Sequence, residues 1–151
     1  MSRASPRLLD ERGSAIVELT WLGLLLLVPL VYVVVAVFTV QRSAYGASEA
    51  VRSAARAYVL SPDVATARTR AVEAAQLAMR DQGVNLDAGD VDIRCSPSPA
   101  DCLTPGSSVE VRLSVDVALP LAPSLFGRSG ASVAVRAAHT ERYSSFRESG
   151  Q

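Results

Sequence analysis

The chain has no lysine, and its 15 arginines are matched by 15 acidic residues, so its formal net charge is zero. Binding to nucleic-acid phosphates needs a surplus of basic residues. The balance therefore predicts that nucleic acid is not a partner. The total of 151 residues is enough for one domain, and the part that follows the apolar segment allows a small core but not a large enzyme.

Motifs for phosphate binding and catalysis are also missing. The sequence contains no glycine-rich phosphate loop, no H-E-x-x-H or G-x-S-x-G pattern and no EF-hand loop. Asp87, Asp90 and Asp92 lack the glycine and the distal glutamate of a calcium loop. The single histidine, His139, stands on an expected strand with no motif around it. We therefore expect no enzyme activity, no cofactor and no metal ion.

Cysteine is scarce, with only Cys95 and Cys102, and the two flank a short proline-rich loop, residues 96–101. This spacing suits a disulfide, which would stabilise the fold by roughly 2–3 kcal/mol. Disulfides persist in oxidising compartments, so the pair favours a domain outside the cytosol. The alternatives are two free thiols in a cytosolic domain, or a zinc site. Zinc is disfavoured because two cysteines and one distant histidine do not supply four ligands.

One long uncharged run, residues 19–40, dominates the N-terminal part of the chain. As a helix it would extend roughly 33 Å, enough to cross the hydrocarbon core of a membrane. A secretory signal has a shorter apolar stretch of about 7–15 residues and ends at a small-residue cleavage site, whereas Gln41 and Arg42 follow this run. The run therefore predicts a membrane anchor. Three arginines flank it on either side, so charge does not decide its orientation.

A short basic leader, residues 1–13, precedes the anchor and ends in Gly13. Ser14 follows, and Glu18 stands five residues after the glycine. This is the arrangement of a prepilin-type signal, in which a peptidase cuts after the glycine and gives the next residue a new α-amino group. Residues four apart share one face of a helix. We therefore expect the ammonium of Ser14 and the carboxylate of Glu18 to pair, within one subunit or between neighbouring subunits.

The stretch from Arg12 to Leu19, with the leucines and valines after it, resembles the N-terminus of the TadE/TadF-like pseudopilins. These are minor pilin-like proteins of tight-adherence (Flp, type IVb-like) pilus systems. The likeness covers about residues 12–60, which hold the cleavage motif, the apolar helix and an extension rich in alanine and arginine. Leu19 stands where many relatives carry an aromatic residue, a departure that concerns the subfamily more than the family.

The resemblance implies a prepilin peptidase as the processing enzyme. It also implies other pilins or pseudopilins and inner-membrane pilus assembly proteins as partners. The protein would cross the cytoplasmic membrane once, with its N-terminus inside and its C-terminal domain outside, or enter an extracellular pilus. A different class of protein fits the same features. It is a permanent single-pass accessory or sensor protein of the envelope, in which Glu18 is only a charge beside the membrane.

The rest of the sequence predicts an α+β fold. Apolar residues at helical spacing extend the anchor to Leu60, and Ser61 is expected to cap a second helix that has Pro62 at its first position and ends at Gly83. Alternating apolar and polar residues then predict a three-stranded antiparallel sheet. The expected parts form a pilin-like architecture and are a leader (1–13), a long transmembrane helix (14–60), an extracytoplasmic α+β domain (61–143) and a flexible tail (144–151).

Overall fold

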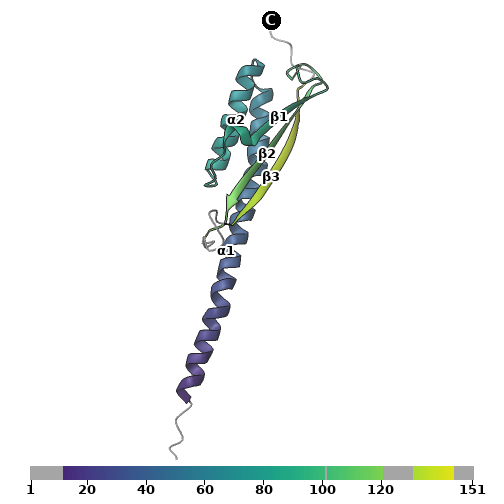
Figure 1. The fold of residues 1–151 in the computed structure, drawn as a ribbon. Helices are drawn as coiled ribbons and strands as arrows, with labels where there is room; N and C mark the ends of the chain where they lie inside the picture. The colour runs from purple at the N-terminus through teal and green to yellow at the C-terminus, as the bar shows by residue number, and fades with distance from the viewer. Residues whose placement is uncertain (1–11, 101, 121–130, 145–151) are drawn as a thin grey trace, which may run out of the picture. The chain divides into compact units, whose positions relative to one another are not determined.

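The computed structural model describes residues 12–100, 102–120 and 131–144, with side chains from Ala15 onward. The expected leader and tail therefore lie outside the described residues, except at Arg12, Gly13 and Ser144. The elements, drawn in Figure 1, are α1 (Arg12–Val59), α2 (Val64–Arg80), the 3-10 helix η1 (Ala88–Asp90), β1 (Val91–Ser96), β2 (Ser108–Ala118) and β3 (Ser132–Arg142). The predicted α+β class, with a long apolar helix, a second helix and a three-stranded antiparallel sheet, is confirmed.

The chain divides into two compact units. The first, the N-terminal unit, is residues 1–35, and its described part is the beginning of α1. The second, the C-terminal unit, is residues 36–151 and holds the rest of α1, all of α2 and the sheet. The two units differ in their surfaces. The described part of the first is apolar and exposed, whereas the second is folded around a core.

The sheet has the order β1-β2-β3, with both pairs antiparallel. Val111 of β2 lies opposite Ile93 of β1 and His139 of β3. Every second residue of β2 is buried, while its neighbours face outward or lie at the margin. The buried residues are Val109, Val111, Leu113, Val115 and Val117. This is the alternation that the sequence predicts for a strand with one face on a core.

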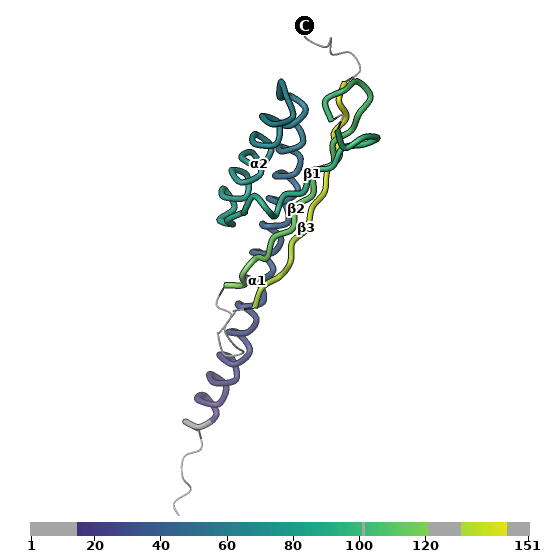
Figure 2. Tube along the Cα trace, turned by 45° about the horizontal axis from the view of Figure 1, so that its top comes forward, coloured from purple at the N-terminus to yellow at the C-terminus, as the bar shows by residue number. Residues whose placement is uncertain are grey.

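The two helices pack on the buried face of the sheet, as both views in Figures 1 and 2 show. Alanines at helical spacing line the contact, because a small side chain lets the backbones of neighbouring elements approach closely. The fully buried alanines are Ala47, Ala50, Ala54 and Ala55 of α1 and Ala67, Ala71 and Ala75 of α2. Tyr58 and Met79 are the two largest fully buried side chains and fill the space between these small residues.

The connection between the helices differs from the expectation. The Ser61 hydroxyl donates to the Ala57 carbonyl oxygen at 2.8 Å, so Ser61 belongs to the end of α1. Asp63 is the N-cap of α2, and its two carboxylate oxygens accept from the Thr66 backbone N–H (2.9 Å) and the Thr66 hydroxyl (2.8 Å). The predicted cap at Ser61 is wrong. Serine and aspartate are both good caps, but only Asp63 accepts two hydrogen bonds from Thr66 in the first turn of α2.

Replacing Asp63 by alanine is expected to lower the melting temperature of the C-terminal unit by a few degrees, while Asp63→Asn keeps an acceptor and loses less. The hydrogen bonds from Thr66 hold the pKa of the Asp63 carboxyl below its ordinary value. Because the folded pKa is the lower one, this stabilisation is present above the ordinary carboxyl pKa and is lost as the pH falls through the folded pKa. Thermal melts at neutral and acidic pH test this. An advantage of the wild type over Asp63→Asn that persists in acid would contradict the cap.

The end of α2 depends on Gly83, as the sequence predicts. The assigned helix stops at Arg80, and the chain then turns through Gly83, which has a φ of 77°. The Gly83 N–H donates to the Arg80 carbonyl oxygen (2.9 Å), and the Val84 N–H donates to that of Met79 (3.0 Å). This pair of bonds is a Schellman motif, which needs a left-handed residue that glycine adopts without a Cβ clash.

Candidate functional site

The expected processing site, Gly13 and Ser14, and the expected assembly residue Glu18 lie close together at the start of α1. Gly13 and Ser14 are within the first turn of α1, and Glu18 follows one turn after Ser14 with an exposed side chain. Residues four apart on a helix have Cβ atoms about 5–6 Å from each other. A cut between Gly13 and Ser14 would therefore leave a helix whose new α-amino group lies on the same face as the Glu18 carboxylate.

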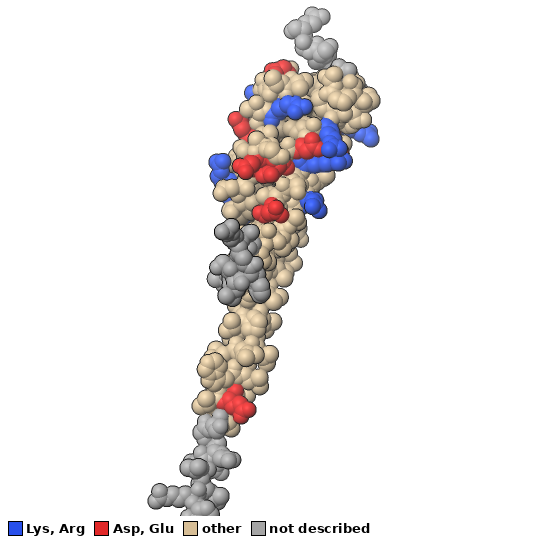
Figure 3. All heavy atoms as spheres, in the orientation of Figure 1, with Lys and Arg blue, Asp and Glu red and all other residues tan. Residues whose placement is uncertain are grey.

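The surface of α1 in the N-terminal unit is apolar and uncovered. Every described side chain from Ala15 to Val35 is exposed except the half-exposed Tyr32, and Leu19 and Trp21 expose 71% and 68% of their surface. The most apolar window of this helix has a mean hydropathy of 2.7, and none of it is buried within the chain. Figure 3 shows uncharged atoms along this part of the helix, with one acidic patch near its N-terminal end.

One polar side chain of this segment, that of Thr20, is satisfied within the helix. Thr20 donates its hydroxyl proton to the carbonyl oxygen of Ile16 at 2.8 Å, so the hydroxyl needs no water. Such bonds to the preceding turn allow threonine to lie in an apolar medium. Glu18 is different, because it is the one charged residue between Gly13 and Arg42 in the sequence. An apolar surface of this extent is typical of a helix covered by lipid or by other helices.

A contact that the sequence analysis does not identify ties α1 to the turn after α2. Arg42 donates from Nε to the Gln82 side-chain oxygen (3.0 Å) and from a terminal nitrogen to the Asp81 carbonyl oxygen (3.2 Å). The Gln82 side chain lies against Gly46, where a Cβ would overlap it. Gly46 within an alanine-rich helix is the one sequence signal of this close approach. The contact therefore joins α1 to the turn after α2 within the C-terminal unit.

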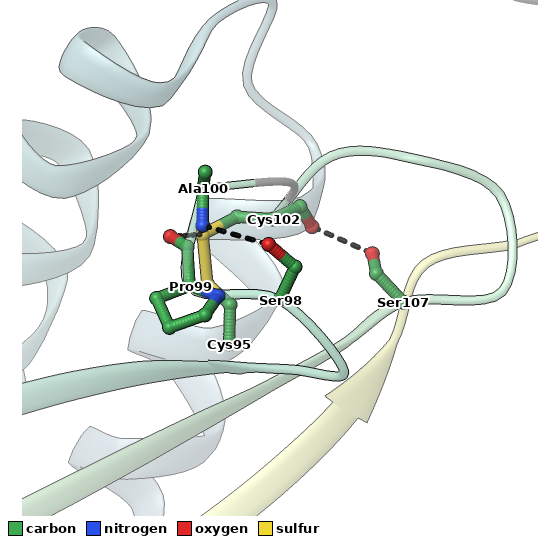
Figure 4. The surroundings of a disulfide bond; sticks show 6 residues. All are labelled: Cys95, Ser98, Pro99, Ala100, Cys102 and Ser107. Atoms are coloured by element: carbon green, nitrogen blue, oxygen red, sulfur yellow. Dashed lines mark hydrogen bonds between the residues drawn. A yellow bond between two sulfur atoms is a disulfide. The ribbon is translucent and has the colours of Figure 1, made fainter.

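The predicted disulfide between Cys95 and Cys102 is present, with the two Cα atoms 5.2 Å apart (Figure 4). Cys95 is in β1 opposite Val109, and Cys102 is almost fully buried. The Ser107 hydroxyl donates to the Cys102 carbonyl oxygen at 2.7 Å, which fixes the far side of the loop. The Cys102 sulfur also lies 3.4 Å from the Pro99 carbonyl oxygen. This is a packing contact, since a disulfide sulfur has no proton to donate.

Two arginines of the sheet form exposed surface pairs with carboxylates on their own strands. Arg94 pairs with Asp92 at 2.7 Å, and Arg112 pairs with Glu110 at 2.9 Å. Pairs of this kind contribute about 0–1 kcal/mol to stability. In the described ranges no group of three or more His, Cys, Asp or Glu side chains is arranged to hold a metal ion. Asp92 lines an open hollow together with Arg112 and Arg136, whose positive charges disfavour a cation there.

A comparison of the chain with protein-family models, with curated proteins and with solved structures found no match. The class of the protein therefore follows from its own features. It is an α+β protein with a disulfide in its C-terminal unit and with one helix near the N-terminus that is long and apolar enough to span a membrane.

Proposed function

We propose that this chain is a pseudopilin or minor pilin of a tight-adherence (Flp, type IVb-like) pilus assembly system. The observation that carries the proposal is the part of α1 from Ala15 to Val35, where every side chain but Tyr32 is exposed and Glu18 is the one charged residue. A helix that only anchors a protein has no use for a carboxylate at the start of its apolar run, and such a residue costs free energy in a membrane. A helix that packs among identical or similar helices can use it as a contact between subunits.

In the proposed mechanism a prepilin peptidase cuts between Gly13 and Ser14 on the cytoplasmic side. The new ammonium of Ser14 then pairs with a Glu18 carboxylate, and the apolar faces of α1 pack against the helices of other pilins. Both interactions act together, because apolar contact alone does not fix how far one helix is shifted along another. The charged pair would fix that register.

The protein would cross the cytoplasmic membrane once, with its N-terminus inside and its C-terminal unit outside, and would work with inner-membrane assembly proteins or enter the pilus. The disulfide supports this orientation, since disulfides persist in oxidising compartments.

Cleavage after Gly13 is expected to be complete in cells that contain the peptidase. Mass spectrometry of the protein extracted from membranes should show an N-terminus at Ser14. Gly13→Leu should abolish cleavage, because a larger side chain would clash in a cleft that accepts glycine. Gly23→Leu is the matched control, since it adds the same side chain to α1 where a Cβ meets nothing within 4 Å. An intact Met1 in the wild type would instead favour a permanent single-pass accessory or sensor protein.

Cys95 and Cys102 are expected to resist alkylation in cells until a reductant is added. The reason is that an outward-facing C-terminal unit keeps its disulfide, whereas cytosolic thiols are held reduced. Intact-mass measurement under non-reducing conditions should show a chain lighter by two hydrogen atoms than the reduced chain. Two thiols that react in untreated cells would contradict the proposed orientation.

A further inference from the structure

A hollow of about 550 Å³ lies in the C-terminal unit, between the end of α1 and the end of β3. Arg52 and Arg56 line it from α1, one helical turn apart, and Arg142 lines it from β3. All three arginine side chains are exposed. None of them forms an ion pair with another residue in the described ranges. Arginines of α1 and β3 therefore line one hollow, and none of them holds a carboxylate in this part of the chain.

The register of the sheet explains why this corner of the fold is polar. The core-facing side of β3 carries Val135, which is buried, and then His139 opposite Val111 and Glu141 opposite Val109. His139 Nε2 lies 3.2 Å from the Glu141 carboxylate, so the one acidic residue that lines the hollow already has a partner. Among the described lining residues, three arginines stand against this one glutamate, so the lining carries an excess of positive charge.

We propose that this hollow binds a carboxylate group carried by an acidic segment of another protein subunit. The guanidinium group presents a planar fork of donors that matches a carboxylate, and residues one turn apart, as Arg52 and Arg56 are, point from the same face of a helix. Val59 and Leu60 add an aliphatic wall that suits the methylene groups of a glutamate. The volume lies within the range of about 300–1,000 Å³ that is usual for binding pockets.

The apolar part of the lining favours an acidic side chain over a free phosphate. Inorganic phosphate has no methylene groups to contact Val59 and Leu60, whereas a glutamate side chain has two.

The position of the hollow favours a protein over a lipid. Arg52 follows Val40, the last apolar residue of the run, by twelve residues, which is roughly 18 Å of helix. The polar layer of a bilayer leaflet is only about 5–8 Å thick.

The test measures fluorescence anisotropy of a labelled tetraglutamate peptide with the full chain in uncharged detergent micelles. This site is separate from Gly13 and Glu18, so the result does not depend on cleavage or assembly. The double variant Arg52→Gln, Arg56→Gln is expected to weaken binding at least about tenfold, because hydrogen bonds to charged groups contribute about 1.5–3 kcal/mol. Arg142→Gln alone should weaken it in the same direction. The matched control, Arg70→Gln with Arg80→Gln, removes equal charge from exposed positions on α2 and should change binding less than about twofold.

Four results would each overturn the proposal. One is a wild-type chain that binds tetraglutamate no better than tetraglutamine. Another is equal weakening of binding in the test variant and in the control double variant, which would show that only the net charge of the protein matters. A third is displacement of the peptide by inorganic phosphate, or by vesicles of anionic phosphatidylglycerol, at a lower competitor concentration than free glutamate requires. Each concentration is counted per negative charge. The fourth is tighter peptide binding by the Glu148→Gln variant, which would show that the chain's own Glu148 competes for the hollow.

Discussion

Replacement of Tyr58 by alanine is expected to lower the free energy of unfolding of the C-terminal unit by about 3–5 kcal/mol, as for other large aromatic residues truncated in a core. Tyr58 is fully buried and belongs to the cluster that joins α1, α2 and the sheet. The surrounding alanines have no flexible side chains that could fill the cavity. Pulse proteolysis of the full chain in detergent across a urea series measures the change.

Tyr58→Phe is the matched control, because it removes the hydroxyl and keeps the ring. The Tyr58 hydroxyl forms no hydrogen bond of ordinary geometry with a described residue. Burial raises the pKa of this hydroxyl, and the Arg68 guanidinium, which is near enough to interact with it, offsets part of that rise. A buried polar group without a partner destabilises a fold. The phenylalanine variant is therefore expected to be as stable as the wild type or more so. A loss comparable to that of the alanine variant would show that the hydroxyl has a partner.

Local patterns in the sequence predict most of the secondary structure. The alternation from Val109 to Val117 identifies β2 and its buried face, because a strand places successive side chains on opposite sides. Gly83 marks the end of α2, because few other residues adopt its backbone conformation. The exception is the start of α2, where Ser61 and Asp63 are both good caps and the choice depends on which donors the next turn presents.

The same reasoning explains which parts of the candidate site could be predicted. Ser14 and Glu18 lie one turn apart, and Cys95 and Cys102 are separated by a short loop, so spacing in the chain nearly fixes spacing in the fold. The Arg42–Gln82 contact and the hollow between α1 and β3 join residues that are far apart in sequence. Single-residue patterns carry no information on such pairs, which depend on how helices and sheet pack.

The C-terminal unit and the N-terminal unit differ in what covers their apolar residues. The C-terminal unit buries its apolar residues within one chain. The described N-terminal unit buries none of its large apolar residues, so its surface must be covered by something outside the chain. Lipid covers an apolar helix equally well however the helix is rotated or shifted along its axis. Neighbouring helices cover it well only when their side chains are in register. The role of Glu18 separates these two situations.

Replacing Glu18 by glutamine is expected to leave leader cleavage and membrane insertion intact and to reduce surface piliation severely. Neither cleavage nor insertion needs the charge, and glutamine fills nearly the same space. In the assembled state, however, the variant leaves the ammonium of Ser14 in apolar surroundings without its carboxylate. Removing one partner of a buried ion pair costs about 3–5 kcal/mol, because the other charge stays uncompensated. At 1.4 kcal/mol per tenfold change, the association constant between subunits would fall by about a hundredfold or more.

The experiment compares leader processing, membrane level and surface piliation in strains that carry Glu18→Gln, Glu18→Asp or Glu49→Gln. Glu18→Asp keeps the charge on a shorter side chain and should retain part of the piliation. Glu49→Gln makes the same chemical change on an exposed position of α1 beyond the apolar run and should be neutral. Normal piliation in Glu18→Gln at normal protein level would remove the pairing role. The carboxylate would then be a tolerated charge at the membrane surface, and packing of the apolar faces alone would have to set the register between helices.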